Sequence, residues 1–325
     1  MISTRLLLPL LVLILFFSFI ISLSSGSMPL SSTDIIRSLF HPLPSSTTHL
    51  ILELRLPRTI SAMLTGALLA VAGSLMQVLV RNPLADPYVL GISGGSAVMA
   101  LLAMLAGLGG LWITSSAFLG ALFAMLLVFG LTHARGSWNP MRLLLTGVVL
   151  AAGWGAMINF ILTISPDQNL RGMLFWLMGD LSYSESNTSA AVILFTGFIF
   201  CWPLARDLNV LNRGEQQASV LGVDTQRLQL LLFFIASLLT ATAVVQAGSI
   251  GFIGLVIPHL IRLLGVTDYR YLLPAAALAG GSLLMLADTL SRTLLAPQQL
   301  PVGIITALLG IPLFLYLLQR GNRTP

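Results

Sequence analysis

The sequence contains no lysine, because all 16 of its basic residues are arginine. A phosphate-binding loop of the GxxxxGK[ST] kind needs its lysine to reach the nucleotide phosphates. This chain therefore cannot bind and hydrolyse ATP by such a loop. Charge is scarce altogether, since 8% of the residues are charged and the formal net charge is +5. The arginines are scattered among apolar stretches, which indicates membrane orientation and excludes a nucleic-acid-binding class.

Cysteine is rare, and paired histidines are missing. Cys201 is the single cysteine, so the chain can form neither an internal disulfide nor a cysteine metal site. The four histidines show no helical pairing of the HExxH kind, and we interpret His259, which follows Pro258, as a structural residue. The sequence predicts no catalytic residue, no metal site and no cofactor.

What the sequence has in abundance is apolar residues, which make up 56% of the chain and give a mean hydropathy of +0.95. Apolar runs of about 20 residues recur, and each has the length needed to cross a bilayer as a helix. The runs are continuous and do not alternate, which argues against membrane strands. The sequence predicts an all-α polytopic membrane protein with about ten spans, at residues 6–24, 59–80, 89–108, 112–132, 142–164, 189–204, 228–247, 252–266, 272–290 and 302–318.

Several of these spans have distinctive patterns. The run 6–24 resembles a signal peptide, but we expect a retained helix because it is long and further spans follow. Small residues in 59–80 predict close helix packing. The glycines of Gly91–Ser96 fit a packed helix start better than a phosphate loop. Glycines and Pro258 in 248–266 predict a short or broken helix buried among others, and residues 165–188 are expected to form a large loop.

Residues 205–227 form the longest polar stretch between two spans on their side of the membrane. It is too short for a catalytic domain but long enough for one or two short helices. A short helix at a membrane surface is suited to receiving force from a soluble partner. It carries six charged residues, namely Arg206, Asp207, Arg213, Glu215, Asp224 and Arg227.

The distribution of arginine predicts orientation. With ten spans and the N-terminus inside, eleven arginines face the cytoplasm and five face outward, so both termini and residues 205–227 are predicted to be cytoplasmic. The outward set is Arg37, Arg55, Arg58, Arg171 and Arg292, and the inward set is Arg5, Arg81, Arg135, Arg142, Arg206, Arg213, Arg227, Arg262, Arg270, Arg320 and Arg323.

Polar groups inside the spans are mostly neutral, such as Gln77, Asn159 and Gln246. The exception is Asp288, which we expect to pair with Arg292 four residues later, in preference to carrying protons. An ion-coupled secondary transporter usually keeps ionisable groups at mid-membrane. The pattern therefore favours a transporter whose energy is supplied by another chain, and an ion-coupled secondary transporter is the alternative of a different class. An intramembrane enzyme would need clustered acids, clustered histidines or a reactive serine inside the spans, and the sequence shows none of these.

A set of motifs from about residue 50 to 318 resembles the permease subunits of ABC importers for ferric siderophores, haem and vitamin B12. Each motif is weak alone, but their order and spacing are specific. They are Arg55–Thr59, Gln77 with Asn82–Pro87, Leu90–Gly95, Arg142–Gly147, Trp176–Gly179, Gly214–Val223, Gly251–His259, Ala287–Asp288 and Leu300–Gly303.

The resemblance implies a type II ABC importer permease fold, with residues 1–325 forming one transmembrane domain of ten helices. It also implies a bacterial inner (cytoplasmic) membrane location, two ATPase subunits below, a periplasmic or surface substrate-binding protein above, and a second permease subunit, expected as a homodimer. The chain itself is then a transport subunit and no enzyme. No nucleic acid is implied as a partner, only membrane lipid and these proteins.

The resemblance also implies roles for individual residues. It implies that the coupling helix received by the ATPase carries Gly214, Glu215, Ala218, Val220, Leu221 and Gly222. It implies that Arg55, Arg58 and Arg292 grip acidic residues of the binding protein, since arginine engages carboxylates bidentately. It implies a cytoplasmic gate at Asn139, Pro140 and Met141, where relatives can carry small hydroxyl residues. The family's cargo is a metal chelate, and we expect a ferric siderophore, with cobalamin or haem as the alternatives.

Overall fold

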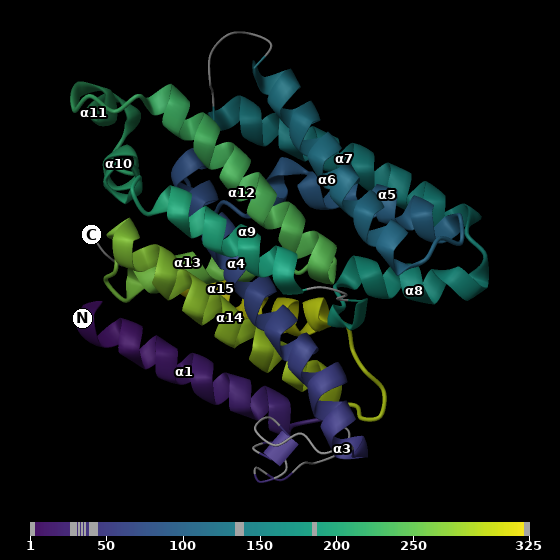
Figure 1. The fold of residues 1–325 in the computed structure, drawn as a ribbon. Coiled ribbons are helices and arrows are strands. Elements are labelled where there is room, and N and C mark those ends of the chain that lie inside the picture. Colours follow the sequence, from purple (N-terminus) through teal and green to yellow (C-terminus); the bar gives the residue numbers. More distant parts are fainter. Residues whose placement is uncertain are drawn as a thin grey trace.

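The computed structural model describes residues 4–26, 31, 33, 35, 37–38, 45–133, 140–183 and 187–321. These residues form helices, turns and loops and contain no strand, which confirms the predicted all-α class. The long helices lie side by side in a bundle, with α1 at one edge and α5, α6 and α7 at the opposite edge (Figure 1).

A helix occupies each of the ten predicted spans. Six described helices are long and apolar enough to cross a membrane, a seventh candidate is α9 with α10, which are bent by 70°, and three more are shorter apolar helices. The ten are α1 (Thr4–Ser24), α4 (Leu56–Val80), α5 (Ile92–Leu105), α6 (Gly110–His133), α7 (Pro140–Ile164), α9 (Asn187–Cys201), α12 (Thr225–Ala247), α13 (Ile253–Leu263), α14 (Tyr269–Thr293) and α15 (Val302–Gly321).

Helix α4 is the centre of the bundle. Its most apolar stretch is 94% buried, against 17% for α7, and its main neighbours are α14 and α12. The predicted small residues make this packing possible. A Cβ on Gly66 would overlap the backbone of Gly280 in α14, and one on Gly73 would overlap that of Gly254 in α13. Glycine is required at these contacts because the two backbones touch directly.

Two regions are more helical than expected. Residues 165–188, expected as a loop, contain α8 (Asp167–Met178) and a short 3₁₀ turn, Leu181–Tyr183. Helix α8 is amphipathic and buries Met173 and Trp176, and its polar face interrupts the apolar run that a span requires.

The second region precedes the second span. Its helix begins earlier than residue 59, because α3 (Ser46–His49) and a π-helical segment (Leu50–Arg55) run directly into α4. Pro57 lies where the π-helical segment passes into α4, and the helical run continues through it.

Helix α13 is short, as predicted, but Pro258 lies within it and does not end it. The break comes before the helix, where Gly248 and Phe252 both have positive φ. The glycine-rich stretch after the 3₁₀ turn Pro87–Leu90 opens α5 and serves packing. A Cβ on Gly94 would overlap Trp154, and one on Gly95 would overlap α6. This confirms the packing interpretation over a phosphate loop.

The bundle has two distinct ends. The start of α1, the end of α15 and the helices α10 (Ala205–Leu211) and α11 (Glu215–Val220) lie at one end (Figure 1). Helices α3 and α8 lie at the other end. The polar stretch 205–227 therefore shares its end of the bundle with both chain termini.

Candidate functional site

The stretch 205–227 forms two short helices and a closing turn that project from the end of the bundle (Figure 1). Helix α10 buries Leu208 and Leu211 fully against the body of the protein. Helix α11 follows after a short turn, and Asp224 then caps α12 by accepting a hydrogen bond from the Arg227 backbone N–H at 3.1 Å. Each short helix carries an acidic residue in its first turn, Asp207 and Glu215, which favours the helix dipole.

Glycines delimit α11 on both sides. Gly214 has φ +132° and Gly222 has φ +82°, conformations that residues with a Cβ rarely adopt. At the C-terminal end the Val223 N–H donates to the Ala218 carbonyl at 3.0 Å and the Gly222 N–H donates to the Ser219 carbonyl at 3.0 Å. These two bonds form a Schellman motif, which satisfies carbonyls that a helix end otherwise leaves unpaired. The C-terminal end of helix α11 is therefore stabilised by the helix's own backbone hydrogen bonds.

The two faces of α11 differ sharply in exposure. Ala218 is fully buried beneath the helix, whereas Val220 is 87% exposed and Leu221 is 69% exposed. Two neighbouring apolar side chains held in water by a rigid helix are typical of a binding surface. Of the predicted coupling residues, Val220 and Leu221 thus face outward, and Ala218 instead supports the helix from within.

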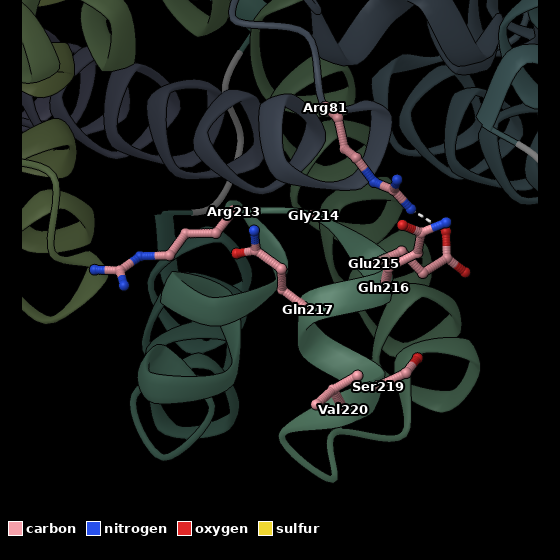
Figure 2. Close-up of a pocket in the computed structure, with 8 residues that line it drawn as sticks. All are labelled: Arg81, Arg213, Gly214, Glu215, Gln216, Gln217, Ser219 and Val220. Carbon is pink, nitrogen blue, oxygen red and sulfur yellow. Dashed lines mark hydrogen bonds and ion pairs between the residues drawn. The ribbon is translucent and has the colours of Figure 1, made fainter.

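An open hollow of about 790 Å³ lies between α11 and the end of α4. Figure 2 shows Arg81, from the end of α4, reaching toward Glu215 of α11, while Arg213 extends away on the other side. Arg81 and Glu215 form an ion pair, and Arg81 has a left-handed backbone with φ +54° where it caps α4. The hollow is lined by Arg81, Arg213, Gly214, Glu215, Gln216, Gln217, Ser219 and Val220.

The opposite end of the chain's fold holds a cluster of buried charges. Asp288 of α14 is fully buried and accepts from Arg292 Nε at 2.9 Å, which confirms the predicted pair four residues apart. It also accepts from Arg58 Nη2 of α4 at 2.9 Å. One carboxylate is therefore shared by two arginines, and the second partner was not predicted.

Arg58 makes further contacts. Its Nη1 donates to Ser182 Oγ at 2.9 Å and to Gln299 Oε1 at 3.0 Å, and Asp180 Oδ1 lies 4.0 Å from its Nη2. These partners come from two different loops, so Arg58 joins α4 to both. Nothing local in the sequence marks them as neighbours, since they lie more than a hundred residues away.

Arg55 and Arg292 hold the end of α1. Arg55 Nη1 donates to the Leu23 carbonyl at 2.9 Å and to the Ser24 carbonyl at 3.1 Å. Arg292 Nη2 donates to Ser22 Oγ at 3.1 Å, and Ser22 is also hydrogen-bonded to Thr59 of α4 at 2.9 Å. Cations near the C-terminus of a helix satisfy its last carbonyls and its dipole.

The three predicted docking arginines therefore lie together, but much of their hydrogen-bonding capacity is used inside the protein. Arg55 is 5% exposed and Arg292 is 8% exposed. A hollow of about 190 Å³ opens onto all three, and it is lined by Gly26, Leu50, Leu54, Arg55, Arg58, Arg292, Pro297 and Gln299. An acidic group entering this hollow would meet three guanidinium groups.

The predicted gate is only partly visible. Asn139 lies outside the described residues, Pro140 begins α7, and Met141 is exposed in its first turn. Among the described residues no group of three histidine, cysteine or acidic side chains could hold a metal ion. The polar residues Gln77 and Gln246 are bound within the bundle, to Leu255 O and to Asn187 Oδ1 respectively.

Comparison with protein families matches residues 13–320 to the FecCD transport family. Relatives include a hemin transport system permease protein of Yersinia pestis, 42% identical over 286 residues, which cover 84% of each chain. A vitamin B12 import system permease protein of Yersinia pseudotuberculosis is 40% identical over 314 residues, 95% of this chain and 91% of the relative. An uncharacterized ABC transporter permease protein of Bacillus subtilis is 39% identical over 327 residues, 94% of this chain and 91% of the relative.

The fold also matches solved structures. A metal-chelate type ABC transporter in an inward-facing conformation superposes with a TM-score of 0.84 at 32% identity, covering 98% of this chain and 99% of that one. A chain of PsaBC from Streptococcus pneumoniae superposes with a TM-score of 0.56 at 15% identity, covering 88% of this chain and 95% of that one, and shares the fold alone.

Proposed function

Because the chain belongs to the FecCD transport family, we propose that it imports a metal chelate, with a ferric siderophore as the first candidate and cobalamin or haem as the alternatives. The chain is an ABC transporter permease embedded in the membrane, and ATP hydrolysis belongs to a separate chain. The cargo is supported by two relatives named for hemin and vitamin B12 transport. The choice of siderophore follows the frequency of that cargo in the family.

Helix α11 is the proposed contact for the ATPase, and its geometry is the observation that carries the proposal. The helix is closed by its own backbone hydrogen bonds and presents Val220 and Leu221 to water. Apolar residues of a short helix can insert into a groove of a partner. Beside them lies the hollow containing Arg81 and Glu215, which offers polar contacts at the rim. The role implies that this end of the bundle, with both termini, is cytoplasmic.

The arginine cluster is the proposed contact for the substrate-binding protein. Arg55, Arg58 and Arg292 carry three positive charges around the smaller hollow, against one fully buried carboxylate, Asp288, and the more distant Asp180. The excess of positive charge favours an acidic group from a partner, and arginine binds carboxylates with two parallel hydrogen bonds.

A second permease subunit is the remaining proposed partner, most simply another copy of this chain. Helix α7 is the least buried of the long apolar helices. In the second half of the helix, the exposed positions Ala152, Ala156, Asn159 and Thr163 share one helical face, which continues toward the helix start with the apolar Leu145 and Val148. Small and polar residues on one face fit contact with protein or a water-filled path better than contact with lipid.

Reconstitution tests the proposal. The chain is placed in vesicles with its ATPase and binding protein, and uptake of radiolabelled ferrichrome, haemin and cyanocobalamin is measured. We expect one of these chelates to accumulate only when ATP is present on the ATPase side. Accumulation driven by a proton or sodium gradient without ATP would support a secondary transporter instead. Concentration of cargo by vesicles that lack the ATPase would overturn the proposal.

A further inference from the structure

Asn209 of α10 makes two hydrogen bonds to the start of α14. Its side-chain Nδ2 donates to Asp268 Oδ1 at 2.8 Å, and its Oδ1 accepts from the Tyr269 backbone N–H at 2.9 Å. The two partners fix the orientation of the amide, because a carboxylate needs a donor and a backbone N–H needs an acceptor. Asn209 therefore holds the turn before α14 through both ends of its amide.

The residues that Asn209 holds are themselves firmly placed. Asp268 caps α14 by accepting from the Arg270 N–H at 3.0 Å, and Tyr269 is fully buried. The Tyr269 hydroxyl accepts from Arg262 Nη2 at 2.7 Å, and the Arg262 guanidinium also lies 5.8 Å from the centre of the Tyr269 ring. Tyr269 therefore connects Asn209, through its backbone, to Arg262 at the end of α13, through its side chain.

Arg262 connects onward to the centre of the bundle. Its Nη1 donates to the side-chain oxygen of Gln77 in α4, and Gln77 Nε2 donates to the Leu255 carbonyl of α13 at 3.1 Å. Helix α13 is therefore connected to Asn209 through Arg262 and Tyr269, and Gln77 connects it to α4 at Arg262 and at Leu255. Since α13 begins at the backbone break before Ile253, it is not rigidly continuous with α12 and can respond as a separate element.

Another polar link joins α11 to the bundle, and it is more exposed than the contacts of Asn209. Glu215 of α11 pairs with Arg81, and both side chains are about one-third exposed at the edge of the larger hollow. An exposed ion pair contributes little to stability and a partner can replace it. The contacts of Asn209 are partly buried and lie away from that hollow, so a partner docked on α11 would leave them intact.

We propose that Asn209 is a positioning residue that transmits movement of α10 and α11 to α13 through the turn at Asp268 and Tyr269. The role rests on the proposed docking of an ATPase on α11. It is a route in addition to the exposed pair of Glu215 with Arg81 and to the covalent chain, which continues from α11 into α12 and from α10 back into α9.

An exchange of the two polar side chains tests the role. In Asn209→Asp, two carboxylates face each other and the link is lost. In the double variant Asn209→Asp with Asp268→Asn, an amide again donates to a carboxylate, and residue 209 still accepts from the Tyr269 N–H. The single variant Asp268→Asn is the matched control, because its amide oxygen can still accept from Asn209 and from the Arg270 N–H. Asn209→Ala removes the link without placing like charges together.

The measurement uses spin labels in the complete transporter. Cysteines replace the exposed residues Arg206 on α10 and Leu263 on α13, each paired with Leu119 on α6, while native Cys201 is fully buried. Distances are compared without nucleotide and with ATP and vanadate. In the parent chain both distances should shift. In Asn209→Asp and Asn209→Ala the α10 distance should shift and the α13 distance should not, with chelate uptake per ATP reduced by about tenfold. The double variant should restore the nucleotide-dependent shift of the α13 distance and the uptake of chelate per ATP.

Three outcomes are distinguishable. An α13 shift that persists in both single variants at residue 209, with normal uptake per ATP, would overturn the transmitting role alone. A loss in Asn209→Asp that the double variant fails to restore would also overturn it. Absence of any nucleotide-dependent shift at α10 in the parent complex would overturn the docking on which the role rests.

Discussion

Arg58 and Asp288 lie 230 residues apart in the sequence, yet Arg58 donates to both carboxylate oxygens of Asp288, with Nε at 3.0 Å from Oδ1 and 3.2 Å from Oδ2. Arg292 binds the same carboxylate from one turn away on α14. The carboxylate thereby lies between the guanidinium group of the buried Arg292 and that of the partly buried Arg58, and it joins α4 to α14. This pairing explains why an acid can lie fully buried in an apolar helix: its charge is compensated on two sides.

Asp288→Asn is expected to destabilise the protein by about 3–5 kcal/mol, because it leaves the buried Arg292 and the partly buried Arg58 adjacent without their shared counter-charge. Thermal unfolding of the purified protein in detergent measures the effect. The control is Asp180→Asn, since Asp180 lies 4.0 Å from Arg58 and makes the weaker contact. Equal losses for the two variants would show that Asp288 does not hold the cluster together.

Gly66→Ala should destabilise the contact between α4 and α14 by about 1–3 kcal/mol, because the added methyl group overlaps the backbone of Gly280 and forces the helices apart. Gly130→Ala on α6 is the matched control, since no atom lies within 4 Å of the added group. The control should be neutral or slightly stabilising, because alanine is the better helix former. A Gly66→Ala protein that unfolds at the parent temperature would contradict the close contact.

Leu221→Ala should lower ATP-driven uptake without changing the unfolding temperature. Leu221 is largely exposed, so its loss removes contact with a partner and not internal packing. ATP hydrolysis and chelate uptake are measured together in vesicles. Leu263→Ala provides the same chemical change at an exposed position on α13 and should transport normally. Glu215→Ala is expected to uncouple hydrolysis from uptake as Leu221→Ala does, and normal uptake by both variants would argue against docking on α11.

Phe252→Gly sets two opposing effects against each other. Phe252 has φ +71°, which costs a bulky residue about 1–3 kcal/mol that glycine does not pay. Its side chain is partly buried and packs directly against Gly310 of α15, so its removal loses a large part of the about 3–5 kcal/mol that a fully buried phenylalanine contributes. Glycine also loses more backbone freedom on folding than any other residue. We therefore expect net destabilisation in thermal unfolding. A more stable variant would mean that backbone strain outweighs the packing on α15.

Much of the fold follows from local sequence. Apolar runs of span length predict the ten helices, and spacing of four residues predicts the pair of Asp288 with Arg292. Runs of small residues predict the close approach of α4 to its neighbours. These features were accessible because each depends on residues near one another in the chain.

The rest depends on contacts between distant segments. Neither the bond from Arg58 to Asp288 nor the bond from Asn209 to Asp268 leaves a local trace, because an arginine or an asparagine near a helix end has many equivalent partners in sequence. Helix α8 was interpreted as a loop because its polar face hides it from a search for membrane spans. The resemblance that identified three arginines as a group did not indicate that two of them also hold the end of α1.

Because α11 ends in its own backbone hydrogen bonds, its outward side chains can vary among related permeases with little effect on the rest of the fold. The six helical residues between the two glycines contact the rest of the chain through Ala218, which is buried below them, and through the ion pair of Glu215 with Arg81. The outward residues, Val220 and Leu221 among them, can therefore be exchanged without disturbing the bundle, provided that Ala218 and Glu215 are kept. Grafting residues 216–221 from a homologous permease, with Ala218 retained, would then change the proposed ATPase contact and leave the fold intact.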